Sequence, residues 1–343
     1  MRPHVVILAG GIGSRFWPAS TPARPKQLLP LGGDRPLISD TLARATELAG
    51  RDRVRILAEN RLAELFRQTE SWLTDDHFFL EPKAAGTGPV LTWAAFRLWE
   101  ADAEATMISL HADHVISPFE EFRTSLDRAV HTAETRNALV CVGIQPERPD
   151  TGYGYIRLGE ESAPGVRMVR RFEEKPDRAR ASTYVASGEY VWNSGIFAWR
   201  AADFLAAVRE LTPEISEALP HLERGDPVAF FDQVTPISVD VGVLERADNV
   251  EVVEATFDWD DVGTWSAVGR TKPADGDGNH VVGSASLLEA SDNIVWSEDG
   301  RVVLFDVDGL VVVRSGDQTL VTSGGGAERL KELLDHLENE AGD

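Results

Sequence analysis

The sequence predicts an α/β fold, in which a Rossmann-like mixed sheet is flanked by helices and followed by a small C-terminal β module. Over about residues 5–143, short apolar runs alternate with amphipathic segments, which is the pattern of β–α units. The first run, residues 5–9, is apolar on both faces, as in a central parallel strand. After a polar, glycine-rich stretch at residues 272–278, short strand-like runs recur about every nine to ten residues. We therefore expect an α/β domain over residues 1–272 and a β-rich domain with a terminal helix over residues 279–343.

The first half of the α/β domain, about residues 1–145, has the most regular alternation. Strands are expected at residues 5–9, 53–58, 78–80, 106–110 and 139–144, and helices at residues 37–48, 61–73, 87–101 and 119–133. Ligands of a doubly wound sheet bind outside the carboxyl ends of its strands. The glycine-rich loop after residue 9, the turn at Glu81 and Asp113 all follow such ends. We expect these three places to face one crevice.

The second half, about residues 146–272, keeps a mixed α and β character. Strands are expected at residues 151–156, 166–172, 190–199 and 250–257, and helices at residues 178–187 and 201–211. In the β-rich domain, strands are expected at residues 281–282, 293–296, 302–305, 310–313 and 319–321, before a helix at 327–337. The spacing indicates either stacked hairpins or one to two turns of a β-helix. This domain carries no clustered chemistry, so we interpret it as a packing or dimerisation surface.

The composition excludes several classes of partner. The chain has 343 residues and a net charge of −22, which repels nucleic acids and anionic membranes. Neither a signal-peptide core nor a membrane-spanning run is present, so we expect a cytoplasmic protein with small-molecule partners. The single cysteine, Cys141, lies in an apolar run and is interpreted as a buried strand residue.

A local anion site is predicted at the N-terminus, against this acidic background. The first 33 residues hold four cations and no acid. The loop at residues 10–14 contains three glycines, which can turn backbone N–H groups towards an anion. It is not a dinucleotide fingerprint, because Phe16 stands where the third glycine belongs, and no P-loop pattern fits. The alternative is an ordinary glycine-rich strand-to-helix turn, which would not need the spaced cations Arg15 and Lys26.

A family resemblance rests on motifs spread from residue 5 to residue 265. They are LAGGIGSRFWP with RPKQ, then EPKAAGT, ADHVI, DTGYGYI, FEEKP, WNSGIF and WDDVGTW. In this order they resemble the bacterial mannose-1-phosphate guanylyltransferases, which are sugar nucleotidyltransferases with a GT-A-like fold. The resemblance implies transfer of GMP from GTP to mannose 1-phosphate, yielding GDP-mannose and pyrophosphate, by a homodimeric enzyme. The chain is too short for the isomerase domain of bifunctional relatives, so we expect a monofunctional enzyme.

Two alternatives to this activity stay open on the sequence. One is a nucleotidyltransferase for another sugar 1-phosphate or another nucleotide, because Gly86, Thr87 and Gly88 stand where the family more often has Asn-Thr-Ala. The other is a catalytically silent sensor of nucleotide sugars. The presence of every charged motif residue argues against the sensor.

The resemblance also implies nucleotide-binding roles. Backbone N–H groups of the loop would hold the triphosphate, Arg15 the departing pyrophosphate and Lys26 the α-phosphate. Arg24 is either a third phosphate ligand or a surface charge. Glu81 and Thr87 would read the base, and Thr87 could also be the N-cap of a helix. The implied nucleotide-binding residues are Leu8, Ala9, Gly10, Gly11, Gly13, Ser14, Arg15, Lys26, Glu81, Gly86, Thr87 and Asp113.

A magnesium site is implied at two aspartates. Asp113 and Asp261 match the family's ligands for Mg²⁺, a cation that prefers oxygen donors. Asp260 is the rival of Asp261. His111 and His114 are interpreted as structural hydrogen-bonding residues, because no third nitrogen or sulfur ligand for a zinc site lies nearby in the sequence.

The sugar phosphate is implied to bind in the second half of the domain. Lys175 would meet the phosphate, and Glu174 would accept hydrogen bonds from sugar hydroxyls. An exposed charged turn is the alternative for this pair. The full set implied for the sugar phosphate is Gly154, Glu174, Lys175, Asn193 and Asp261. The implied catalytic residues are Arg15, Lys26, Asp113, Lys175 and Asp261.

Overall fold

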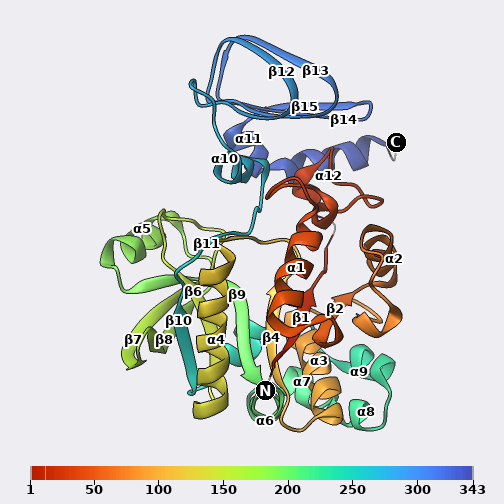
Figure 1. Ribbon diagram of the computed structural model, residues 1–343, viewed down its shortest axis with the longest axis vertical. Helices are drawn as coiled ribbons and strands as arrows, with labels where there is room; N and C mark the ends of the chain where they lie inside the picture. The colour runs from red at the N-terminus through yellow and green to blue at the C-terminus, as the bar shows by residue number, and fades with distance from the viewer. Residues whose placement is uncertain (1, 12, 342–343) are drawn as a thin grey trace. The chain divides into compact units, whose positions relative to one another are not determined.

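A nine-stranded mixed sheet forms the centre of one of the two compact units in this computed structural model, which describes residues 2–11 and 13–341 (Figure 1). The strand order is β3-β2-β1-β4-β9-β6-β10-β8-β7. The strands are β1 (His4–Leu8), β2 (Val54–Ala58), β3 (Phe78–Leu80), β4 (Thr106–His111), β6 (Leu139–Ile144), β7 (Tyr155–Ala163), β8 (Val166–Glu173), β9 (Tyr190–Arg200) and β10 (Val250–Glu254). Strands β3, β2, β1 and β4 are parallel, and β9 runs antiparallel to both β4 and β6. This arrangement confirms the predicted mixed α/β sheet.

Helices cover both faces of this sheet. Along β6, Leu139 and Cys141 belong to the same buried cluster as α3 and α6, whereas the alternate residues point to the opposite face, where α4 packs. The chain divides into two compact units, and the first comprises residues 1–10, 41–112 and 116–259. Its helices are α2 (Asn60–Thr69), α3 (Thr87–Ala101), α4 (Phe119–Arg136), α5 (Arg178–Ser187), α6 (Ala201–Leu211), α7 (Pro213–Ser216), α8 (Leu219–Glu223) and α9 (Pro227–Gln233), with the short helices η3 (Arg51–Arg53), η4 (Asp75–His77) and η5 (Asp240–Leu244).

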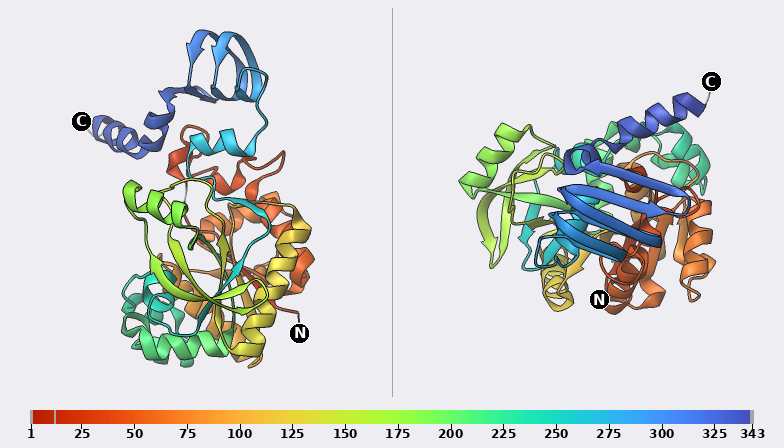
Figure 2. Two further views of the ribbon diagram at one scale, coloured as in Figure 1. Left: turned by 90° about the vertical axis from the view of Figure 1, so that its left-hand side faces the viewer. Right: turned by 90° about the horizontal axis from the view of Figure 1, so that it is seen from above.

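The second unit comprises residues 11–40, 113–115 and 260–343. Its four-stranded sheet has the order β12-β13-β14-β15, and the strands lie side by side in Figure 2. The elements are η1 (Ser14–Phe16), η2 (Lys26–Leu28), η6 (Trp265–Ala267), α10 (Val268–Thr271), β12 (His280–Ser291), β13 (Ile294–Asp308), β14 (Leu310–Ser315), β15 (Gln318–Ser323), α11 (Gly324–Glu328) and α12 (Leu330–Ala341). Helix α1 (Leu37–Ala49) and the paired strands β5 (Val115–Ser117) and β11 (Asp258–Asp260) have residues in both units. The domain boundary expected at residues 272–279 stays a prediction.

Parallel pairing of β12 with β13 and of β13 with β14 agrees with the β-helix alternative, and only β14 and β15 pair as a hairpin. Asn293 marks the stacking of successive turns. Its Nδ2 donates to Asn279 Oδ1 at 2.9 Å, and its own Oδ1 accepts from the backbone N–H of Leu310 at 2.9 Å. These side chains satisfy buried polar groups between neighbouring turns.

Several expected element boundaries were wrong. β12 and β13 are long strands, because a bulge at Gly283, with φ of 90°, lets β12 continue past the glycine instead of ending there. The helix expected at 61–73 ends at Thr69, and the helix expected at 327–337 is divided at Arg329. The strand expected at 151–156 begins only at Tyr155, because Asp150 Oδ1 accepts from the backbone N–H of Gly152 and holds a loop there. Helices α7, α8 and α9 were not expected.

Candidate active site

Lys26 joins three distant parts of the sequence within the second unit. Its Nζ donates to Asp113 Oδ2 at 2.7 Å and to the backbone oxygen of Asp261 at 2.7 Å. The Lys26 side chain is only 8% exposed, so its ammonium is compensated by these acceptors rather than by bulk water. The structure therefore brings three of the predicted catalytic residues together.

The glycine-rich loop is shaped by the segment that carries Lys26. A Cβ added at Gly13, which has φ of 72°, would lie 2.3 Å from Lys26 Cβ, so only glycine fits. Gln27 is buried, and its Nε2 donates to the backbone oxygen of Gly11 at 3.1 Å. Sequence reasoning missed this role of Gln27, although the residue stands in the quoted RPKQ motif. Ile12, in the middle of the loop, lies outside the described residues.

Arg15 and Asp261 approach one another at Gly263. A Cβ at Gly263 would lie 3.2 Å from Asp261 Oδ2 and 3.6 Å from Arg15 Nη1. Arg15 is exposed, and no salt bridge to it occurs among the residues that the structure describes. Arg24, in contrast, pairs with Glu298 at 2.7 Å, which favours its interpretation as a surface charge. Arg15 is thus the cation of this segment best suited to bind an added anion.

Asp260 and Asp261 have different surroundings. Asp260 accepts from Arg270 Nε at 2.5 Å and from Arg270 Nη2 at 3.1 Å, and its Oδ1 also accepts from the backbone N–H of Val262 at 2.7 Å. Val262 is buried and has φ of 45°, a strained conformation for a β-branched residue. Both carboxylate oxygens of Asp260 therefore form hydrogen bonds that stabilise this turn. The arrangement favours Asp261 over Asp260 as a metal ligand.

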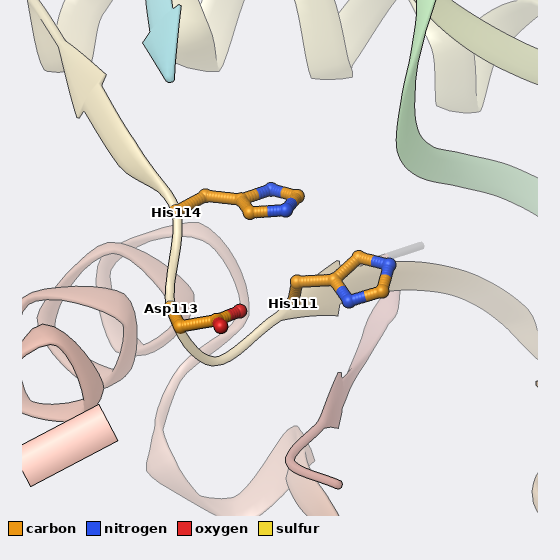
Figure 3. A group of neighbouring side chains, drawn as sticks. All are labelled: His111, Asp113 and His114. Carbon is orange, nitrogen blue, oxygen red and sulfur yellow. The ribbon is translucent and has the colours of Figure 1, made fainter. Parts of the chain in front are cut away.

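A group of potential metal ligands lies at the end of β4 and in the turn that follows it (Figure 3). His111, Asp113 and His114 each offer one ligand atom, and these atoms lie within 4.8 Å of one another. Two nitrogens and one carboxylate oxygen can hold a divalent metal ion. His111 also packs on Gly195, where an added Cβ would lie 2.7 Å from its Nε2.

Three residues predicted for the sugar phosphate meet at Gly154 in the first unit. A Cβ there would lie 3.0 Å from Glu174 Oε2 and 3.6 Å from Asn193 Cβ. Lys175 is exposed, has φ of 39°, and pairs with the carboxylate of its neighbour Glu174. An exposed pair of this kind is weakly held, so both side chains can reorient towards a ligand. Sequence reasoning missed Asp240, whose Oδ1 accepts from Asn193 Nδ2 at 2.6 Å, because no motif marks η5.

The turn predicted to read the base is fixed by residues 237–239 of the first unit. A Cβ at Gly86 would lie 2.7 Å from the backbone oxygen of Ile237, which also accepts from the N–H of Gly88 at 3.0 Å. The N-cap alternative for Thr87 was wrong. Gly86 is the N-cap, and Thr87 is the first residue of α3. The Thr87 hydroxyl instead accepts from the N–H of Val239 at 2.9 Å.

The other residues predicted to bind the nucleotide are distributed over the two units. Leu8, Ala9 and Gly10 end or follow β1 in the first unit, whereas Gly11 and Ser14 belong to the second. Leu8 and Ala9 are buried, so their side chains are core residues and only their backbone can serve a ligand. None of the described helices is both long enough and apolar enough to cross a membrane.

Known proteins resemble this chain along nearly its full length. The family model for Nucleotidyl transferase matches residues 4–277. The mannose-1-phosphate guanylyltransferases of Escherichia coli and Klebsiella pneumoniae are each 35% identical over 347 residues, and each match covers 97% of this chain and 73% of the relative. The crystal structure of a protein described as a mannose-1-phosphate geranyltransferase, from Thermus thermophilus, has a TM-score of 0.92 and 33% identity. That match covers 98% of this chain and 100% of the other.

Glu81 has an unusual protonation equilibrium. Burial, and secondarily the nearby charge of Glu59, raise the pKa of Glu81 from 4.5 to about 7. The folded protein therefore holds this proton over a pH range in which the unfolded chain releases it.

We predict that Glu81 makes stability fall as pH rises from about 4.5 through 7. The native state binds the extra proton in that window, so the free energy of unfolding should decrease by up to about 3 kcal/mol. Glu81→Gln stays neutral and should lack this decrease. Urea unfolding of both proteins at pH 5 and pH 8 measures it. Parallel pH dependence of the two proteins would contradict the assignment, and Glu59→Gln, which removes the lesser cause, should give an intermediate result.

Proposed function

Because the chain belongs to the nucleotidyl transferase family, we propose that it is a mannose-1-phosphate guanylyltransferase, which transfers GMP from GTP to mannose 1-phosphate. A phosphate oxygen of mannose 1-phosphate attacks the α-phosphorus of GTP. The bond from that phosphorus to the bridging oxygen breaks, GDP-mannose forms, and pyrophosphate leaves with the bridging oxygen. The observation that carries this proposal is the buried ammonium of Lys26, joined to Asp113 and to the Asp261 turn beside the glycine-rich loop.

The chain's own residues neutralise and align two anionic reactants. Backbone N–H groups of Gly10, Gly11, Gly13 and Ser14 bind the triphosphate. Arg15, exposed and near Asp261, binds the pyrophosphate as negative charge develops on it. Lys26 Nζ already donates to Asp113 and to the backbone of Asp261, and its third N–H binds on the α-phosphate side. These roles require no proton transfer from the protein, because the attacking phosphate oxygen is already ionised.

We further propose Mg²⁺ as the metal, held by Asp113 and Asp261. Carboxylate oxygens are the donors that Mg²⁺ prefers, and it would supply further positive charge at the phosphates when bound. Lys26 already brings the Asp113 carboxylate to the backbone of Asp261. The imidazoles of His111 and His114 would give a transition metal such as Zn²⁺ an advantage, so Zn²⁺ is the informative comparison.

Glu81 and the Gly86–Thr87 turn are proposed to read the base. An ionised Glu81 can accept from guanine N1–H and from the 2-amino group together, which adenine cannot offer. The Gly86 backbone is exposed and Thr87 is half-buried, so both can approach a base at this turn. The raised pKa of Glu81 means that this ionised form becomes dominant only above about pH 7.

The proposed function is tested by measuring pyrophosphate release over a matrix of nucleoside triphosphates and sugar 1-phosphates. GTP with mannose 1-phosphate should give the highest kcat/KM. A different best pair would establish the alternative of another sugar or nucleotide. Binding of both ligands without pyrophosphate release would favour the sensor.

Asp113→Ala and Asp261→Ala should each abolish turnover, because each removes a proposed metal ligand. Asp113→Ala should also lower the free energy of unfolding, because it removes an acceptor of the buried Lys26 ammonium. Asp260→Asn should keep turnover but lower the free energy of unfolding by about 1–3 kcal/mol, because it weakens the pair with Arg270. Pyrophosphate release and urea unfolding measure the two effects.

A matched control for Asp260 is Glu214→Gln, which breaks the bidentate pair of Glu214 with Arg246 and should lower stability alone. Loss of turnover in Asp260→Asn, with near-normal turnover in Asp261→Ala, would reverse the assignment of the two neighbours.

Lys175→Ala should raise the KM for mannose 1-phosphate by about 10- to 100-fold and leave the KM for GTP nearly unchanged, because Lys175 is proposed to bind only the sugar phosphate. Glu174→Ala should reduce discrimination among mannose, glucose and N-acetylglucosamine 1-phosphates. Steady-state kinetics with the three sugar phosphates measures both. Lys83→Ala, which removes an exposed lysine paired with Asp232 at 2.9 Å, is the control. Equal losses for GTP and sugar phosphate in Lys175→Ala would refute the separate subsites.

A homodimer is also proposed, through exposed apolar side chains of the β12–β15 sheet. Leu288 and Phe305 are partners in the β12–β13 pairing and are 63% and 61% exposed, and Val303 and Val321 are similarly exposed. Adjacent exposed apolar side chains, such as Leu288 and Phe305, are typical of protein interfaces. A cytoplasmic location stays a prediction.

Phe305→Asp should convert the dimer to a monomer, because a charge on this face opposes its burial. Sedimentation equilibrium measures the mass directly. Val228→Asp is the control, because Val228 is 56% exposed on α9 and lies outside this sheet. A wild-type monomer, or an unchanged dimer in Phe305→Asp, would refute this interface.

A further inference from the structure

Asn193 lies at an irregularity of β9 that its own neighbours stabilise. The pairing of β6 with β9 shifts register between Cys141 and Gly143, and Gly195 has φ of 71°. The N–H of Gly195 donates to Asn193 Oδ1 at 3.1 Å, and the N–H of Ile196 donates to Ser194 Oγ at 3.1 Å. Bulges of this type often direct a side chain towards a functional site.

The amide of Asn193 is held from both ends. Its Oδ1 accepts from the N–H of Gly195, and its Nδ2 donates to Asp240 Oδ1 at 2.6 Å. An amide can flip by exchanging its oxygen and nitrogen, but here the acceptor Asp240 requires the nitrogen and the donor Gly195 requires the oxygen. One N–H and one lone pair of Asn193 are then available in fixed directions.

Asp240 comes from η5, 47 residues after Asn193 in the sequence, and is half-buried. Burial raises its pKa, whereas the hydrogen bond from Asn193 lowers it; Glu174 and His111 also act on it electrostatically. Keeping a carboxylate there has a desolvation cost. Glu174 and Asn193 both line the space at Gly154, so the carboxylate lies behind residues proposed to meet the sugar.

We propose that Asp240 is a positioning residue, which fixes the Asn193 amide so that Asn193 selects the sugar by the direction of its hydroxyls. The inference rests on the proposed function, because it concerns the same sugar subsite. A fixed donor and acceptor reject a hydroxyl of the wrong orientation, whereas an amide free to flip accommodates either orientation.

The test compares Asp240→Ala with Asp240→Asn in the full chain. Asp240→Ala should raise the KM for mannose 1-phosphate about tenfold and reduce the preference for mannose over glucose 1-phosphate, with the KM for GTP unchanged. Asp240→Asn keeps an acceptor for Asn193. It should therefore retain most of the wild-type affinity for mannose 1-phosphate and most of the preference for mannose. Asp203→Ala is the control, because Asp203 is another carboxylate whose pKa burial raises, on α6. If Asp240→Ala does not fold by circular dichroism, Asp240→Ser replaces it.

A double-mutant cycle with Asn193→Ala separates positioning from direct binding. If Asp240 acts through Asn193, Asp240→Ala should have no further effect once Asn193 is alanine. Multiplying losses in the double variant, an unchanged Asp240→Ala, or equal losses for GTP and sugar phosphate would each overturn the inference. The wild-type protein in the same assay distinguishes failure of the proposed function from failure of the positioning role. Wild-type inactivity with every substrate pair refutes the proposed function, whereas an active wild type with an unaltered Asp240→Ala refutes only the positioning role.

Discussion

The buried ammonium of Lys26 is the constraint on which the second unit depends. A charge that is removed from water must be met by fixed acceptors, and here these are Asp113 and the backbone oxygen of Asp261, each at 2.7 Å. Gly13 must lack a side chain, because a Cβ there would collide with Lys26. The glycine of the loop, the lysine of the next motif and the two distant aspartate turns therefore satisfy a single geometric requirement, although they are separate in the sequence.

In a chain of net charge −22, the ion pairs of the loop's cations decide which of them can bind an anion. Of the loop's cations, Lys26 is neutralised by Asp113, and Arg24 is neutralised by Glu298. Arg15 is exposed and forms no salt bridge within the described part of the chain. Individual carboxylates thus neutralise Lys26 and Arg24, whereas the guanidinium of Arg15 stays accessible to the phosphates of the proposed substrate.

Sequence reasoning predicted the features that are encoded by short, continuous stretches of the chain. The alternating apolar runs gave the sheet, and the motifs gave the glycine loop and the cluster at Gly154. Asp240 could not be predicted, because its importance arises from a contact between segments 47 residues apart. The N-cap alternative for Thr87 was wrong, because its hydroxyl accepts from the N–H of Val239 instead of capping the helix. The length of β12 was underestimated. A glycine in a strand signals either the end of the strand or a bulge, and only the pairing of β12 with β13 distinguishes the two.

The strained turn after Asp261 shows how the β-rich module contributes to the candidate site. A β-branched residue with positive φ costs of order 1–3 kcal/mol, so Val262 must be stabilised by its surroundings. Asp260 accepts from its N–H, Arg270 fixes Asp260, and the Val262 side chain is buried in a cluster with Phe16, Trp265, Trp296 and Val313. That cluster combines the segment after the glycine loop with strands of the module. The packing that maintains the Asp261 turn is therefore supplied partly by β13 and β14, and the module is a structural support of the site, in addition to any role in dimerisation.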